Sequence, residues 1–127
     1  MIELTELWNF DDPAGSEQRL RAAQVEAPET EAAVLQTQVA RALGLQGRYA
    51  EALAVLDGIE CTDPEVTVRS LLERGRVYRS SGDVTAAAPL FEAAVAAADQ
   101  GLEGLAIDAM HMVALTLKEI GRASCRE

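Results

Sequence analysis

A pattern centred on glycine occurs twice in this chain, and its repetition constrains the fold more than any other feature. The two copies read Ala40-x-x-Leu43-x-x-x-Gly47-x-Tyr49-x-x-Ala52-x-x-x-Leu56 and Gly75-x-x-Tyr78-x-x-x-Gly82-x-Val84-x-x-Ala87-x-x-x-Phe91, offset by 35 residues. Self-similarity at this period is typical of helical units that stack side by side, because one unit alone cannot bury its apolar stripe. The pattern therefore predicts an all-α fold that presents binding surfaces and does not carry out chemistry.

The composition agrees with closely packed helices. The chain has 127 residues, enough for one domain with a modest core, and 49% of them are hydrophobic while only 4% are aromatic. The apolar residues are mostly Ala, Leu and Val. Alanine and leucine favour helices over strands, and small side chains let helices pack closely.

The charge of the chain excludes several classes of partner. Eleven basic and 21 acidic side chains give a net charge of −10, which repels nucleic-acid backbones and anionic lipid surfaces. No stretch approaches the run of about 18 apolar residues that a membrane-spanning helix requires. The acidic amino terminus does not resemble a secretory signal. Cys61 and Cys125 make no disulfide framework, so we expect a cytoplasmic protein.

Apolar spacing, prolines and glycines predict about six helices. Asp12-Pro13 and Asp63-Pro64 each combine a capping carboxylate with proline at the first helical position, and Thr30 is expected to cap the second helix. The predicted helices cover residues 12–25, 30–46, 49–59, 63–81, 83–98 and 103 onward. Their short connections make neighbouring helices antiparallel.

Two further expectations concern the inside of these helices. Pro89 falls in the second turn of the fifth helix, where it removes a backbone donor, so we expect a bend or a late helix start. Ala40, Gly75 and Ala114 are small enough to let paired helices approach closely, while aromatic rings such as Phe91 fill the spaces between pairs.

With these features the chain resembles the tetratricopeptide repeat family, whose unit is a helix-turn-helix with small, aromatic and glycine positions in this order. The resemblance covers repeats at about 33–66 and 68–102 and half-repeats at 12–26 and 103–119. It implies a short right-handed solenoid of antiparallel helix pairs that binds proteins or peptides without catalysis. The sequence departs from the pattern at Arg74, at Leu56, and in a third unit offset by 39 residues.

The resemblance also implies a binding surface. In that family the first helix of each repeat lines a concave groove. Counting back 13, 10, 6 and 3 residues from Gly47, Gly82 and Gly121 gives twelve positions, which hold five of the nine basic residues that precede residue 120. We therefore predict a basic groove that binds an acidic partner inside an acidic shell. The candidate groove residues are Arg41, Arg69, Arg76, Arg79, His111 and Lys118.

Two other interpretations stay open. Arg69, Glu73 and Arg76 have the spacing at which charges pair along one helix surface without binding any ligand. The chain could also be a regulatory or sensor arm of a larger multidomain protein. Trp8 and Phe10 are expected to attach the amino-terminal segment to the first helix pair.

Catalysis has little support in the sequence. His111 is the only histidine, and Asp108 lies three residues before it, which places the two on one helix face. Such a pair is half of a proton-transfer apparatus, but it is far commoner as a surface contact. No paired Cys or second His has metal-ligand spacing. We expect no enzyme activity, no cofactor and no metal.

The last eight residues, 120–127, match one translated frame of a short-read sequencing adapter. We expect them to be a non-native read-through tail, with the native frame ending near Lys118 or Glu119. The repeat array would then stop in the middle of a unit. Without a following helix, Met110 and Leu117 would be only half covered, which predicts weak self-association through the last helix.

Overall fold

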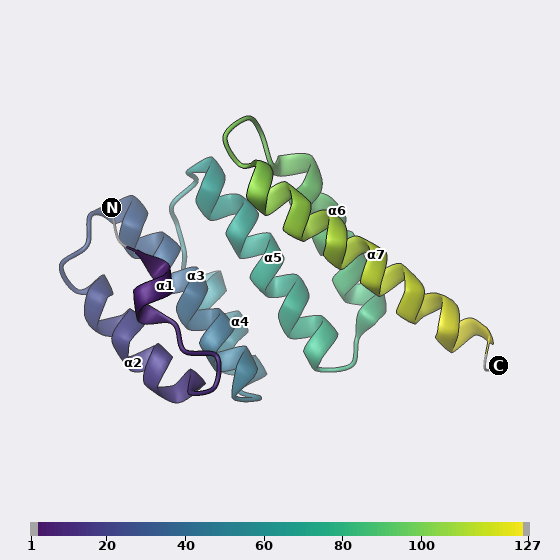
Figure 1. Ribbon diagram of the computed structural model, residues 1–127, viewed down its shortest axis with the longest axis horizontal. Coiled ribbons are helices and arrows are strands. Elements are labelled where there is room, and N and C mark those ends of the chain that lie inside the picture. Colours follow the sequence, from purple (N-terminus) through teal and green to yellow (C-terminus); the bar gives the residue numbers. More distant parts are fainter. Residues whose placement is uncertain (1–2, 126–127) are drawn as a thin grey trace.

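The structure is a computed structural model that describes residues 3–125, and the side chains of residues 3–122. Within that range the chain is all-helical, with seven α-helices and no strand (Figure 1). The helices are α1 Leu4–Leu7, α2 Pro13–Gln24, α3 Glu29–Leu45, α4 Tyr49–Asp57, α5 Pro64–Ser80, α6 Val84–Ala97 and α7 Glu103–Cys125. The six predicted helices are α2 to α7, and the single-turn α1 was not predicted. Residues 120–125 continue α7, and residues 126–127 of the expected tail lie outside the described range.

Capping side chains fix where the helices begin. The carboxylates of Asp12 and Asp63 accept hydrogen bonds from the first-turn amides of α2 and α5, both at 3.0 Å. These caps confirm the prediction, since each satisfies an amide that has no partner within the helix. Thr30 does not cap α3, which begins at Glu29 directly after Pro28.

The two glycines of the repeated pattern close their helices in the same way. Gly47 has φ +76° and Gly82 has φ +96°, the left-handed geometry that favours glycine. In each turn the residue after the glycine donates its backbone N–H to the carbonyl oxygen five residues earlier, at 2.9 Å and 2.8 Å. The sequence repeat is therefore also a repeat of backbone geometry.

The close approach of α5 and α6 follows from Gly75, whose position would bring an added Cβ within 2.5 Å of Cε1 of Phe91. Ala40 is fully buried, whereas Ala114, which was also expected in a close helix contact, is exposed. Pro89 lies inside α6, which already begins at Val84. Of the two expected effects, the late helix start is therefore wrong, and the bend stays a prediction.

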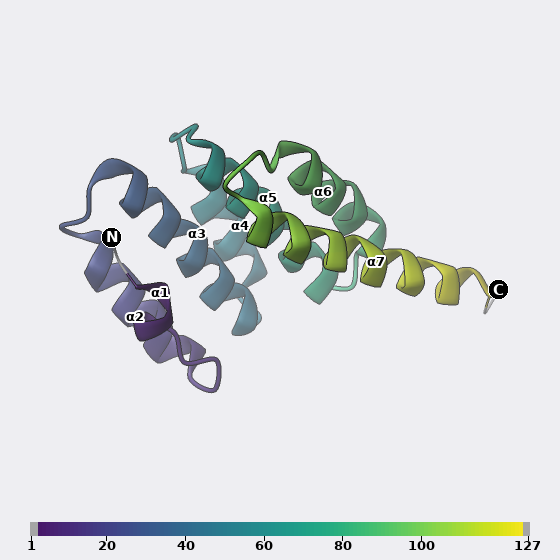
Figure 2. The same ribbon diagram turned by 45° about the horizontal axis from the view of Figure 1, so that its top comes forward.

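Packing proceeds from one helix to the next along the chain. Contacts join α2 to α3, α3 to α4, α5 to α6 and α6 to α7, while α5 also contacts α3, α4 and α7. Figures 1 and 2 show the result as an elongated array with the two chain ends at opposite ends of the molecule. Among the described residues, no helix combines the length and the apolar character needed to cross a bilayer.

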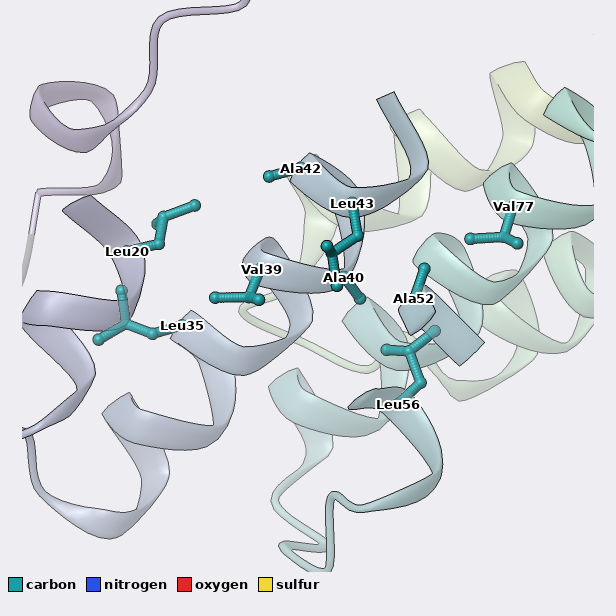
Figure 3. Packing of buried hydrophobic residues seen from close by; sticks show 9 residues of the cluster. All are labelled: Leu20, Leu35, Val39, Ala40, Ala42, Leu43, Ala52, Leu56 and Val77. Atoms are coloured by element: carbon teal, nitrogen blue, oxygen red, sulfur yellow. The ribbon is translucent and has the colours of Figure 1, made fainter. Parts of the chain in front are cut away.

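The buried residues form two clusters instead of one centre. The first cluster joins α2, α3 and α4 and reaches Val77 of α5, and Figure 3 shows its side chains meeting between these helices. Phe91 and Leu72 belong to the second cluster, which joins α5, α6 and α7. Tyr49 connects neighbouring helix pairs, because its hydroxyl donates to the carbonyl oxygen of Ser80 at 3.2 Å.

The amino-terminal segment lies against α2 and α3. Leu4, Leu7 and Trp8 pack on the first cluster, and Nε of Arg19 donates to the carbonyl oxygen of Leu7 at 3.0 Å. Phe10 is 56% exposed and stacks on Trp8, with ring centroids 4.7 Å apart. As predicted, the two aromatic residues help to attach this segment to the first helices.

Candidate functional site

A groove of about 300 Å³ lies between α3, α5 and α7. The carboxyl-terminal halves of α3 and α5 form two of its sides. These halves are equivalent in the sequence repeat, since each is followed by a turn, at Gly47 or at Gly82. The amino-terminal half of α7 forms the third side. The groove is lined by Arg41, Gly44, Leu45, Glu73, Arg76, Val77, Arg79, Ser80, Asp108 and Met112.

The structure brings three of the six candidate residues together, since Arg41, Arg76 and Arg79 all line this groove. Arg69 lines a smaller hollow of about 140 Å³, near the amino-terminal ends of α3 and α5. His111 and Lys118 are exposed on α7 and are not among the residues that line either hollow.

The rotation of α7 about its own axis explains why His111 and Lys118 lie outside the groove. Gly121 was used as the closing glycine of a third unit, but it lies inside α7 and has no positive φ. Asp108 and Met112 line the groove, and Glu119 reaches Arg79 from the same helix. This spacing of four and seven residues is one helical stripe. It shares Asp108 with the stripe counted back from Gly121 and then lies one residue further along the helix.

Most of the arginines near the groove already have carboxylate partners. Arg76 donates to Oε2 of Glu73 at 2.7 Å and to Oδ2 of Asp108 at 2.6 Å, which joins α5 to α7. Arg79 contacts Glu119 at 2.8 Å. Burial acts to lower the pKa of Arg76, but the charges and hydrogen bonds of its two carboxylate partners outweigh it, so the pKa is raised.

Ion pairs along one helix are also present, as the alternative interpretation of Arg69, Glu73 and Arg76 expected in part. Glu73 and Arg76 pair at i,i+3 within α5, whereas Arg69 pairs with Glu65 at 2.8 Å. Arg74, which departs from the family pattern, pairs with Asp57 of α4 at 2.8 Å. The groove is therefore less basic than its count of arginines indicates.

Arg41 differs from its repeat equivalent, Arg76. The residue equivalent to Glu73 in the first copy is Gln38, which is neutral, and its Oε1 accepts a hydrogen bond from Nε1 of Trp8 at 3.1 Å. Within residues 3–125, Arg41 makes no ion pair at salt-bridge distance. Its guanidinium instead lies over the rings of Trp8 and Phe10, 5.7 and 5.0 Å from their centroids.

Electrostatics leaves this guanidinium open to an anion. Burial lowers the pKa of Arg41, and although the charges of Glu73 and Asp108 raise it, the pKa stays below its usual value. The charged form of Arg41 is thus incompletely compensated, since the nearest carboxylates are shared with Arg76. A carboxylate supplied from outside would complete its environment.

Whereas Arg41 lacks an acceptor in the described part of the chain, Glu73 lacks a hydrogen-bond donor there. Its side chain is only 3% exposed, and Oε2 accepts from Arg76. The other oxygen, Oε1, is buried and has no hydrogen-bond partner among the described residues. An unsatisfied buried acceptor is rare in proteins and unfavourable, so this oxygen marks a place where a donor is missing.

Sequence reasoning missed two parts of this site. It named Glu73 only as an ion-pair partner, and it did not connect Trp8 with Arg41. Aligning the two repeat copies gives the available signal, because Gln38 replaces Glu73 and so removes the partner of Arg41. Among the described residues no hydrogen bond joins Asp108 to His111, and the carboxylate of Asp108 pairs with Arg76.

No family model, curated protein or solved structure matches this chain. The candidate site therefore stands on its own geometry. In the part of the chain that the structure describes, no group of three or more His, Cys, Asp and Glu side chains is placed to hold a metal ion.

Proposed function

We propose that this protein is a non-catalytic scaffold of the tetratricopeptide repeat type, which binds an acidic peptide or protein segment in the groove between α3, α5 and α7. The observation that carries this proposal is Arg41, a half-buried guanidinium that faces the groove without an ion pair among the described residues. Its two cysteines make no disulfide framework, which favours the cytoplasm as its compartment.

The repeat architecture is supported by backbone and packing together. Two helix-closing turns have the same hydrogen bonds at an offset of 35 residues, successive helices pack in chain order, and the buried residues form two clusters. Stacked units of a right-handed solenoid would have these properties, because each unit contacts only its neighbours. The face formed by α3, α5 and α7 would be the concave one.

The acidic character of the partner follows from Arg41, the groove arginine without an ion pair among the described residues. With a net charge of −10, the protein repels anions in general. Arg41 is held over two aromatic rings, so its position is fixed before a ligand arrives. A fixed guanidinium binds a carboxylate through two parallel hydrogen bonds. Affinity should fall with added salt, since exposed charges are screened over about 8 Å at physiological ionic strength.

Fluorescence anisotropy with two pools of labelled decapeptides tests this function. In one pool Asp or Glu occupies alternate positions, and in the other Asn or Gln replaces them. The wild-type chain should bind the acidic pool more tightly, and Arg41→Gln should weaken that binding about tenfold. Arg21→Gln, on the exposed side of α2, is the matched control and should bind like the wild type. Equal binding of the two pools, or an Arg41→Gln variant that binds normally, would contradict the proposal.

A further inference from the structure

The geometry points to a more specific ligand. We propose that the groove recognises a carboxylate that carries an N–H donor beside it, as an acidic residue in peptide linkage does. Arg41 would bind the carboxylate, and Oε1 of Glu73 would accept the N–H. This inference rests on the proposed function and narrows the partner from any acidic segment to one that presents both groups.

The need for a donor comes from Glu73. Its Oε1 is buried without a hydrogen-bond partner among the described residues, in a side chain that lines a groove of about 300 Å³. A ligand that is only an anion has no donor and cannot satisfy this oxygen. Because this oxygen has almost no surface open to the groove, Glu73 would turn it toward the groove as the ligand N–H binds. Hydrogen bonds to a charged acceptor are among the stronger ones in proteins.

The need for an acceptor comes from Arg41. Both terminal nitrogens of Arg76 are already bound to carboxylates, at 2.7 and 2.6 Å, and Arg79 is paired with Glu119. Arg41 has no such partner within the described range, and Trp8 lies against its guanidinium. Stacking on an aromatic ring engages the face of a guanidinium and leaves its in-plane N–H groups free to donate.

The charges of the groove balance before any ligand binds. The two positive charges of Arg41 and Arg76 are matched by the two negative charges of Glu73 and Asp108. The charge of Arg79 is matched by its ion pair with Glu119. A balanced site with one missing donor and one missing acceptor favours a ligand that offers both, over one that offers charge alone. Simple dianions such as sulfate should therefore bind poorly, because they offer charge but no N–H donor.

Two small probes test the requirement for an N–H. N-acetyl-aspartate N′-methylamide carries the side-chain carboxylate and two N–H groups, and its fully N-methylated analogue has the same carboxylate and none. NMR titration of the 15N-labelled full chain measures both affinities. The first probe should bind at the groove about tenfold more tightly than the second. Equal binding of the two probes, or binding of neither, would overturn the inference.

Substitution of Glu73 tests which residue accepts the N–H. Glu73→Gln keeps the size of the side chain and replaces an acceptor with an amide that also donates, so it should abolish the preference for the N–H probe. Glu51→Gln, at an exposed ion pair of α4, is the control and should keep it. A preference that survives Glu73→Gln would overturn the inference. If the acidic peptide pool still binds through Arg41 in that case, the proposed function stands without it.

Discussion

Gly75 of α5 and Phe91 of α6 share one packing space, because a Cβ at Gly75 would lie 2.5 Å from Cε1 and 2.8 Å from Cδ1 of the ring. Phe91 is fully buried at the centre of the second cluster, so the ring has little room to move. This contact sets how closely the two helices of the second repeat approach each other.

Gly75→Ala should therefore destabilise the protein by about 1–3 kcal/mol, the usual effect of overpacking a core. Gly44→Ala is the matched control within α3, since its Cβ would lie 3.6 Å from Cγ2 of Val77, an ordinary contact. The control should be neutral or stabilising by up to about 1 kcal/mol, because alanine favours helix over glycine. Urea denaturation measures both, and equal stabilities for the two variants would contradict this packing account.

Glu17 of α2 should make stability depend on pH. Its carboxylate contacts Gln46, Arg48 and Arg21 at 3.0, 3.0 and 2.9 Å. Burial acts to raise the pKa of Glu17, but these hydrogen bonds and charges outweigh it, so the pKa lies below the ordinary 4.5. A lowered folded-state pKa contributes stability that is complete above about pH 5 and is lost as the pH falls through the lowered value.

Glu17→Gln should accordingly unfold more easily at pH 7, by about 1 kcal/mol. This difference should shrink as the pH falls through the lowered pKa of Glu17, because the protonated carboxyl is as neutral as the amide. Denaturation curves of the two proteins at several pH values measure this difference. Glu51 pairs with Arg48 from an exposed position, so Glu51→Gln should show a smaller effect. If the stability difference between the wild type and Glu17→Gln did not change with pH, the ion pairs of Glu17 would not be its cause.

Asp83 begins α6, and its Oδ1 accepts a hydrogen bond from the backbone N–H of Ala86 at 3.1 Å. Asp83→Ala should lower the stability by about 1 kcal/mol through loss of this cap. Asp83→Asn retains a capping oxygen and should stay within a few tenths of a kcal/mol of the wild type. Thermal unfolding followed by circular dichroism compares the three, and an unchanged Asp83→Ala midpoint would show that the cap contributes nothing.

The exposed apolar residues of α7 predict weak self-association, in which the last helix of one molecule contacts a second copy. Ile107, Met110 and Leu117 are 64%, 50% and 54% exposed, and patches of this kind associate in water. The apparent mass from light scattering should rise with concentration for the wild type, and this rise should disappear when Ile107 and Met110 are both replaced by Glu. A wild-type chain that stays monomeric at high concentration would contradict the prediction.

The helices could be predicted because their signals are local. The caps at Asp12 and Asp63, the turns at Gly47 and Gly82 and the apolar spacing each depend on a few neighbouring residues. The one-turn α1 carries no such signal, since it contains no cap hydrogen bond and no buried residue.

The residues of α3 and α5 that line the candidate groove could be predicted because a turn fixes the phase of each helix. Arg41 and Arg76 were found because real turns follow α3 and α5, whereas Lys118 was placed by Gly121, which makes no turn. Contacts between distant segments could not be read from spacing. The hydrogen bond that connects Trp8 to α3 spans 30 positions in the sequence, and the unmatched oxygen of Glu73 depends on how three helices meet.

The most direct test of the binding groove is an NMR titration of the 15N-labelled full chain with the acidic decapeptide pool. Backbone amide shifts should concentrate in residues 41–45 of α3, 73–80 of α5 and 108–112 of α7, the segments that line the groove. In Arg41→Gln these shifts should require about tenfold more peptide. Shifts confined to any other surface, or no saturable shifts at all, would contradict the proposal that this protein binds its partner between these three helices.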